Sequence, residues 1–117
     1  MDQMKREQLE AAGIDVAGAL ERFMNNENLL ERMLKKFLTD ANYQKLLEAA
    51  EKQDAQQGLE ASHTLKGLCG NLSMTALASL FTRQVELFRS DDSQGAFAML
   101  PEISEAYRQV TDCISSL

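Results

Sequence analysis

The sequence predicts an all-α protein, an antiparallel up-down four-helix bundle with a short extra N-terminal helix. Apolar residues recur at three- and four-residue steps over most of the chain, which is the period of an amphipathic helix. No window alternates apolar and polar residues as a half-buried strand does. Only short polar segments separate the helical stretches, and short connections favour antiparallel neighbours.

The N-terminal half is expected to contain two helices after a polar start. Residues 1–12 are polar, and we expect them to be partly ordered, as a frayed or weakly helical segment. A short helix then begins after Asp15, a good N-cap that is followed by apolar residues at helical spacing. From about Glu27 to Gln53 there is neither glycine nor proline, and the apolar pattern is continuous. This predicts one long helix, with Asn42-Tyr43 as the place for a bend.

The C-terminal half is expected to contain three helices. The first covers about 54–72, and the second begins at Ser73 or Met74 and runs to about Arg89. A polar loop at 90–93 separates them from a last helix over about 94–116, which Pro101 should start late or kink. Residues 13–117 are therefore expected to form a single domain.

Composition excludes several classes of function. Twelve basic residues against eighteen acidic ones give a net charge of -6 in 117 residues, which disfavours binding to nucleic acid or to an anionic membrane. A single histidine excludes a multi-histidine metal site. The chain shows no transmembrane run and no secretory signal, so we expect a cytoplasmic protein. Cys69 and Cys113 form no CxxC motif and are expected to be reduced, small apolar core residues.

The helix expected over 54–72 carries an unusual face opposite its apolar stripe. The only histidine, His63, lies there, with Lys66 at i+3, Gly67 at i+4 and Gly70 at i+7. Each glycine inside a helix costs about 1 kcal/mol relative to alanine, so a pair needs a reason. Glycine at i+4 leaves the imidazole open to a large partner, and the lysine supplies a positive charge. A partly neutral, nucleophilic imidazole beside a cation suits phosphoryl transfer.

Simpler interpretations stay open for each of these residues. A surface histidine alone usually has no role, and a His-x-x-Lys pair alone is common. Gly67 and Gly70 are also compatible with close packing of two helices, or with a helix end near Asn71. The conjunction of the four residues on one face favours the phosphoryl-transfer interpretation.

The segment from Ser62 to Leu72 resembles the signature of histidine-containing phosphotransfer (HPt) domains. It reads SHTLKGLCGNL, against a family pattern of roughly A-H-T-L-K-G-x-x-G-N-L. The resemblance extends over about 13–117, because Gly13-Ile14-Asp15 and Leu34–Leu38 are similar to the family's N-terminal segment and first long helix. Ser62 departs mildly from the usual alanine. Gly58 stands where a larger apolar residue is common, which would loosen the start of this helix.

The resemblance implies roles for three residues in phosphoryl transfer. His63 would be the phosphoacceptor, modified at Nε2. Lys66 would stabilise the phosphoryl group, and Gly67 would keep the ring accessible.

The resemblance also implies a surface for the partner. Leu59 and Gly70 would belong to it, and so would Gln84, which lies near the place where some relatives bind the phosphate. Met33 or Phe37 on the long helix would add to this surface.

The function implied is that of a phosphorelay intermediate, which passes phosphoryl groups between the aspartates of receiver domains. The response regulator or hybrid kinase would supply the aspartate and the Mg²⁺, so we expect no cofactor or metal on this chain, and a monomer. There is no glycine-rich phosphate loop for an ATP site, and no Ser or Cys at i±3 or i±4 of His63 for a hydrolase. The alternative is a helical adaptor that docks on a receiver domain without being phosphorylated.

Overall fold

The structure, a computed structural model of residues 1–117, contains helices and no strands, which confirms the predicted all-α class. The helices in chain order are α1 (Gln3–Ala11), α2 (Val16–Arg22), α3 (Glu27–Phe37), α4 (Asn42–Lys52), α5 (Ala55–Asn71), α6 (Thr75–Arg89), α7 (Ser93–Ala98) and α8 (Leu100–Ser115). None of them is both long enough and apolar enough to cross a bilayer.

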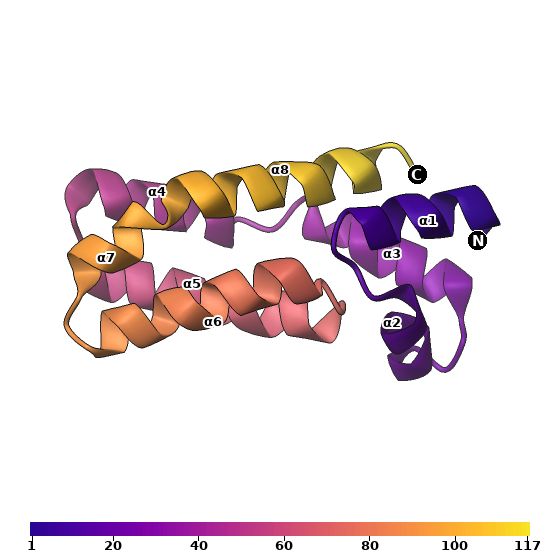
Figure 1. The fold of residues 1–117 in the computed structure, drawn as a ribbon, viewed down its shortest axis with the longest axis horizontal. Coiled ribbons are helices and arrows are strands. Elements are labelled where there is room, and N and C mark those ends of the chain that lie inside the picture. Colours follow the sequence, from indigo (N-terminus) through magenta and orange to yellow (C-terminus); the bar gives the residue numbers. More distant parts are fainter.

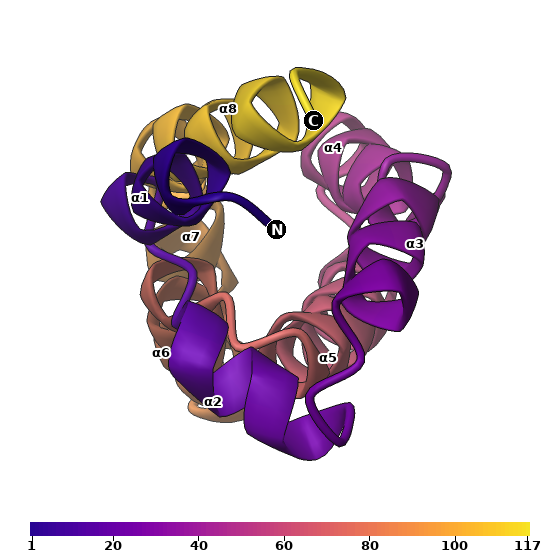
Figure 2. The ribbon, with the colours of Figure 1, turned by 90° about the vertical axis from the view of Figure 1, so that its right-hand side faces the viewer.

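The molecule is elongated, with principal extents of 43 × 23 × 20 Å. Figure 1 shows α5, α6 and α8 along the long axis, with α7 at one end and α1, α2, α3 and both termini at the other. In the end-on view of Figure 2 the helices surround a common centre. Buried apolar side chains from the surrounding helices fill it, among them Leu30, Leu34, Leu46, Leu65, Leu77, Phe81, Ile103 and Ile114.

The prediction of one continuous helix over 27–53 is wrong, because there are two helices, and they separate just before Asn42-Tyr43, where a bend was expected. α3 ends at Phe37 and α4 begins at Asn42. Between them the Asp40 carboxylate accepts hydrogen bonds from the backbone and side-chain amides of Asn42, at 2.8 and 2.9 Å. Short polar side chains that bond to nearby amides compete with continuation of a helix. The apolar pattern runs through the break because both helices face the same core.

The N-terminal segment is more regular than the sequence predicts. Asp2 caps α1 by accepting a hydrogen bond from the Lys5 amide at 2.8 Å. Leu9 is fully buried in the common core, and the Lys5 ammonium lies 3.4 Å from the Glu31 carboxylate on α3. α1 thus shares this core with the other helices. A domain boundary before Gly13 stays a prediction.

The last predicted helix begins late, as expected from Pro101. Residues 93–98 form the short α7, and α8 starts at Leu100 with the proline in its first turn. The N–H groups of a first turn have no partner within the helix, so proline, which lacks an N–H, costs no hydrogen bond there. α5 and α6 confirm the expected positions of the two preceding helices to within two residues.

The two cysteines differ in burial and should differ in reactivity. Both are free; Cys69 is fully buried, as expected, whereas Cys113 is only partly buried. Burial, with a smaller contribution from Asp40, raises the pKa of the Cys69 thiol to about 12.

Since the thiolate is the reactive form, we expect an alkylating reagent at about pH 8 to modify Cys113 and to spare Cys69 until the chain unfolds. Mass spectrometry after timed alkylation measures this, with Cys113→Ser as the control; equal rates at both thiols in the native protein would contradict it.

Candidate functional site

α5 presents the predicted site because only one of its faces is buried. Asp54 caps the helix by accepting a hydrogen bond from the Gln57 amide at 3.0 Å. The buried face packs against α4 and α6. It consists of Gly58, Ala61, Ser62, Leu65 and Cys69. The opposite face, which carries His63 and Gly67, is not packed against another helix over most of its length.

His63 is exposed on this free face. It lines a shallow pocket of about 320 Å³, and the other lining residues are Gln56, Leu59, Glu60, Thr64 and Arg89. Lys66 lies three residues later and is half-buried. No acidic side chain forms an ion pair with this lysine, so its charge is not used inside the protein.

The glycines of α5 fall into two kinds. A Cβ added at Gly67 or at Gly70 would meet no atom within 4 Å. Close helix packing inside this protein therefore does not explain these two glycines. A Cβ at Gly58, by contrast, would lie 2.6 Å from Phe88 Cζ and 3.0 Å from Phe97 Cζ. The absence of a side chain at Gly58 thus lets two aromatic rings pack against the start of α5. The sequence predicted a loosened helix at this place.

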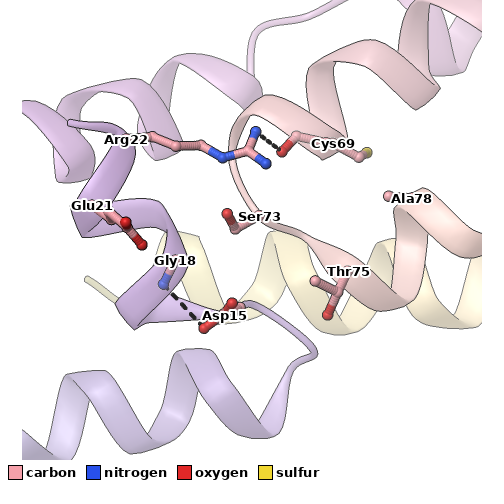
Figure 3. Close-up of a pocket in the computed structure, with 9 residues that line it drawn as sticks. Asp15, Gly18, Glu21, Arg22, Cys69, Ser73, Thr75 and Ala78 are labelled. Atoms are coloured by element: carbon pink, nitrogen blue, oxygen red, sulfur yellow. Dashed lines mark hydrogen bonds between the residues drawn. The ribbon is translucent and has the colours of Figure 1, made fainter.

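Gly70 has a structural partner in α2. The Arg22 guanidinium donates a hydrogen bond of 2.6 Å to the Gly70 carbonyl, close to the C-terminal end of α5. Figure 3 shows the arginine side chain reaching across from α2 toward this end. A cation is favourable there because carbonyls at a helix C-terminus carry partial negative charge. The contact uses the backbone of Gly70 and leaves its Cα side open.

A second, more apolar surface lies between α2, α3 and α5. It is a groove of about 870 Å³ whose apolar lining includes Phe23, Met33, Phe37 and Leu68. Of the two candidates on the long helix, Phe37 is almost fully buried and Met33 is half-buried. Met33 is therefore the more accessible of the two.

Gln84 does not fit the partner-binding role expected for it, and that prediction is corrected. Its side chain is fully buried, and its Nε2 donates a hydrogen bond of 3.0 Å to the Ala96 carbonyl. Its Oε1 is buried without a hydrogen-bond partner. The residue links α6 to α7 inside the core. The sequence alone does not predict this position, because the turn between α5 and α6 decides which face of α6 a residue occupies.

Arg89 is the site residue that sequence reasoning missed. It is exposed at the last position of α6 and lines the same pocket as His63. The two residues are 26 positions apart, and an antiparallel pair of helices brings them together. The sequence signal was the basic residue at the end of the predicted helix, but its position opposite α5 depends on the geometry of the turn.

A comparison with known families identifies the class of protein. The family model described as "Hpt domain" matches residues 30–113, more than two thirds of the chain. The chain belongs to the Hpt domain family. Hpt domains serve phosphotransfer in two-component phosphorelays as phosphocarriers that interact with receiver domains and have no ATP site of their own. Comparisons with curated proteins and with solved structures gave no match.

The contrast between the glycines predicts opposite effects of one substitution. Gly67→Ala should raise the free energy of unfolding by up to about 1 kcal/mol, because alanine favours the helix and meets no neighbour. Gly58→Ala gains the same propensity but forces apart Phe88 and Phe97, which should make it about 1–3 kcal/mol less stable than Gly67→Ala. Urea unfolding followed by circular dichroism compares the two variants. Equal stabilities would refute the packing role of Gly58.

Proposed function

We propose that this Hpt domain accepts and donates a phosphoryl group on His63, as an intermediate between receiver-domain aspartates. The observation that carries the proposal is the free face of α5. His63 is exposed there, and Gly67 and Gly70 leave open space that nothing inside the protein requires. A side chain at either position would stand on the face that an approaching partner must reach. The space therefore serves a contact outside this chain.

The chemistry needs little from the chain itself. A lone pair on the imidazole, at Nε2 by resemblance to the family, attacks the phosphorus of the receiver's phosphoaspartate. A P–N bond forms, the P–O bond breaks with its electron pair on the departing carboxylate, and the ring proton passes to solvent. The reverse reaction donates the group. The receiver holds the Mg²⁺ that neutralises charge during transfer.

Two cations are placed to stabilise the phosphorylated histidine. Lys66 stands on the neighbouring turn of the helix, and Arg89 lines the histidine pocket from α6. Neither side chain is engaged in an ion pair. Both are therefore available to a phosphoryl group, which offers three acceptor oxygens.

The docking surface surrounds the histidine. In this proposal Leu59 contributes apolar contact from the pocket itself and Gly70 allows close approach one turn beyond Gly67. Met33 extends the contact to the groove beside α5. In the same proposal the domain acts as a cytoplasmic monomer. α3 and α4 together take the place of one helix of an antiparallel four-helix bundle, and α5, α6 and α8 are the other three.

The decisive experiment is transfer from a phosphorylated receiver domain. Purified protein mixed with ³²P-labelled receivers should gain acid-labile, alkali-stable label, and His63→Gln should gain none. Thermal unfolding of the variant should match wild type, because His63 is exposed. Label on His63→Gln equal to that on wild type would refute the proposal. A His63→Gln variant that still supports signalling in cells would favour the unphosphorylated adaptor.

The two cations should each contribute to transfer without supporting the fold. We expect Lys66→Gln and Arg89→Gln each to reduce the rate of transfer about 5- to 50-fold, which corresponds to the loss of one charge-assisted hydrogen bond of about 1–2.5 kcal/mol. Rapid-quench measurement of label transfer gives the rates. Arg83→Gln, also exposed on α6 but outside the pocket, is the control. Unchanged transfer by Arg89→Gln would remove Arg89 from the site.

A further inference from the structure

The histidine pocket contains an acidic side chain as well as a basic one. Glu60 lines it together with His63 and Arg89. Glutamate at i−3 occupies the neighbouring turn of the same helix face, where Cβ atoms lie about 5–6 Å apart. The position mirrors that of Lys66, which stands three residues after the histidine.

The Glu60 carboxylate is held by a neutral donor and by no cation. Gln56 Nε2 donates a hydrogen bond of 3.0 Å to Glu60 Oε1. No lysine or arginine lies within ion-pair distance, although Arg89 lines the same pocket. No cation therefore neutralises its negative charge in the pocket that it shares with the imidazole.

Phosphorylation changes what this charge does. Unphosphorylated His63 is a neutral or singly positive ring, which a carboxylate leaves undisturbed or stabilises. A phosphoryl group on the ring brings about two negative charges to the same pocket. Repulsion then raises the free energy of the phosphorylated form alone, so it acts on the equilibrium between the two forms.

We infer that Glu60 sets the position of the phosphotransfer equilibrium and biases His63 toward donating its phosphoryl group. The inference rests on the proposed function and adds to it a residue that opposes Lys66 and Arg89. The two cations stabilise phosphorylated His63. Glu60 destabilises it, so that the phosphoryl group can still pass on to a receiver. Glu60 acts on the reaction through charge and takes no part in bond formation.

The test needs a phosphoryl donor of known chemistry, and phosphoramidate serves. The imidazole nitrogen attacks phosphorus, the P–N bond of the donor breaks, and the amine leaves as ammonium with the ring proton. Fixed ratios of phosphoramidate to ammonium, approached from both directions, define the equilibrium. ³¹P NMR and intact-protein mass spectrometry give the ratio of phosphorylated to free His63.

Glu7 provides a matched control for Glu60. It is exposed on α1, forms no ion pair, and accepts a hydrogen bond of 2.9 Å from a glutamine four residues before it, as Glu60 does. Glu7→Gln therefore makes the same change in net charge and in local bonding away from the pocket. Glu60→Asp keeps the charge and should stay closer to wild type than Glu60→Gln.

We expect Glu60→Gln to raise the ratio of phosphorylated to free His63 about two- to fivefold at low salt, and Glu7→Gln to leave it unchanged. The difference between the ratios of Glu60→Gln and wild type should shrink toward none at about 1 M salt, where charges this far apart are screened.

An unchanged ratio for Glu60→Gln, an equal rise for Glu7→Gln, or a rise that persists in high salt would overturn the inference. Transfer from a receiver to His63 that is normal in the same preparation would show that the proposed function nevertheless stands. A wild type that takes no phosphoryl group on His63 would overturn both.

Discussion

The burial of one face of α5 between α4 and α6 is the constraint on which the candidate site depends. Ala61, Leu65 and Cys69 are at most 3% exposed, so rotation of the helix about its axis would bring apolar surface into water. The same packing determines which residues of α5 lie on the opposite face. His63, a residue with no strong contact of its own, is thereby placed by residues that take no part in its chemistry.

This arrangement separates stability from function within a single helix. Gly58 belongs to the packed face and is required by two aromatic rings, whereas Gly67 lies on the free face and is required by nothing in the protein. Charge follows the same division. The ion pairs of the protein lie on other helices, while the charged residues around the histidine stay unpaired. The charges on the free face are thus left unpaired, as the proposed transfer of a phosphoryl group to His63 requires.

The sequence predicted the helical class and the positions of α5 and α6, because their apolar spacing and caps are local properties. It also placed His63 on the exposed face, since the apolar stripe of one helix determines the opposite face. It indicated a bend at Asn42-Tyr43, but not the full break before it, because a side chain bonded to the Asn42 amide leaves the apolar period intact. The error at Gln84 and the omission of Arg89 share one cause. Both depend on the register of α6 against α5, which a turn of a few residues sets and no periodicity reveals.

The hydrophobic core extends beyond the residues that the family model matches. The family match begins at residue 30, yet the preceding segment brings Leu9, Ile14, Val16, Ala19 and Leu20 into the common core. Arg22 also reaches from this segment to the end of α5. A fragment trimmed to the family match would expose the apolar surface that these side chains cover, and such surfaces promote association between molecules. Fusions and reporters built on this domain should therefore retain the first two helices, even though the histidine lies on the fifth.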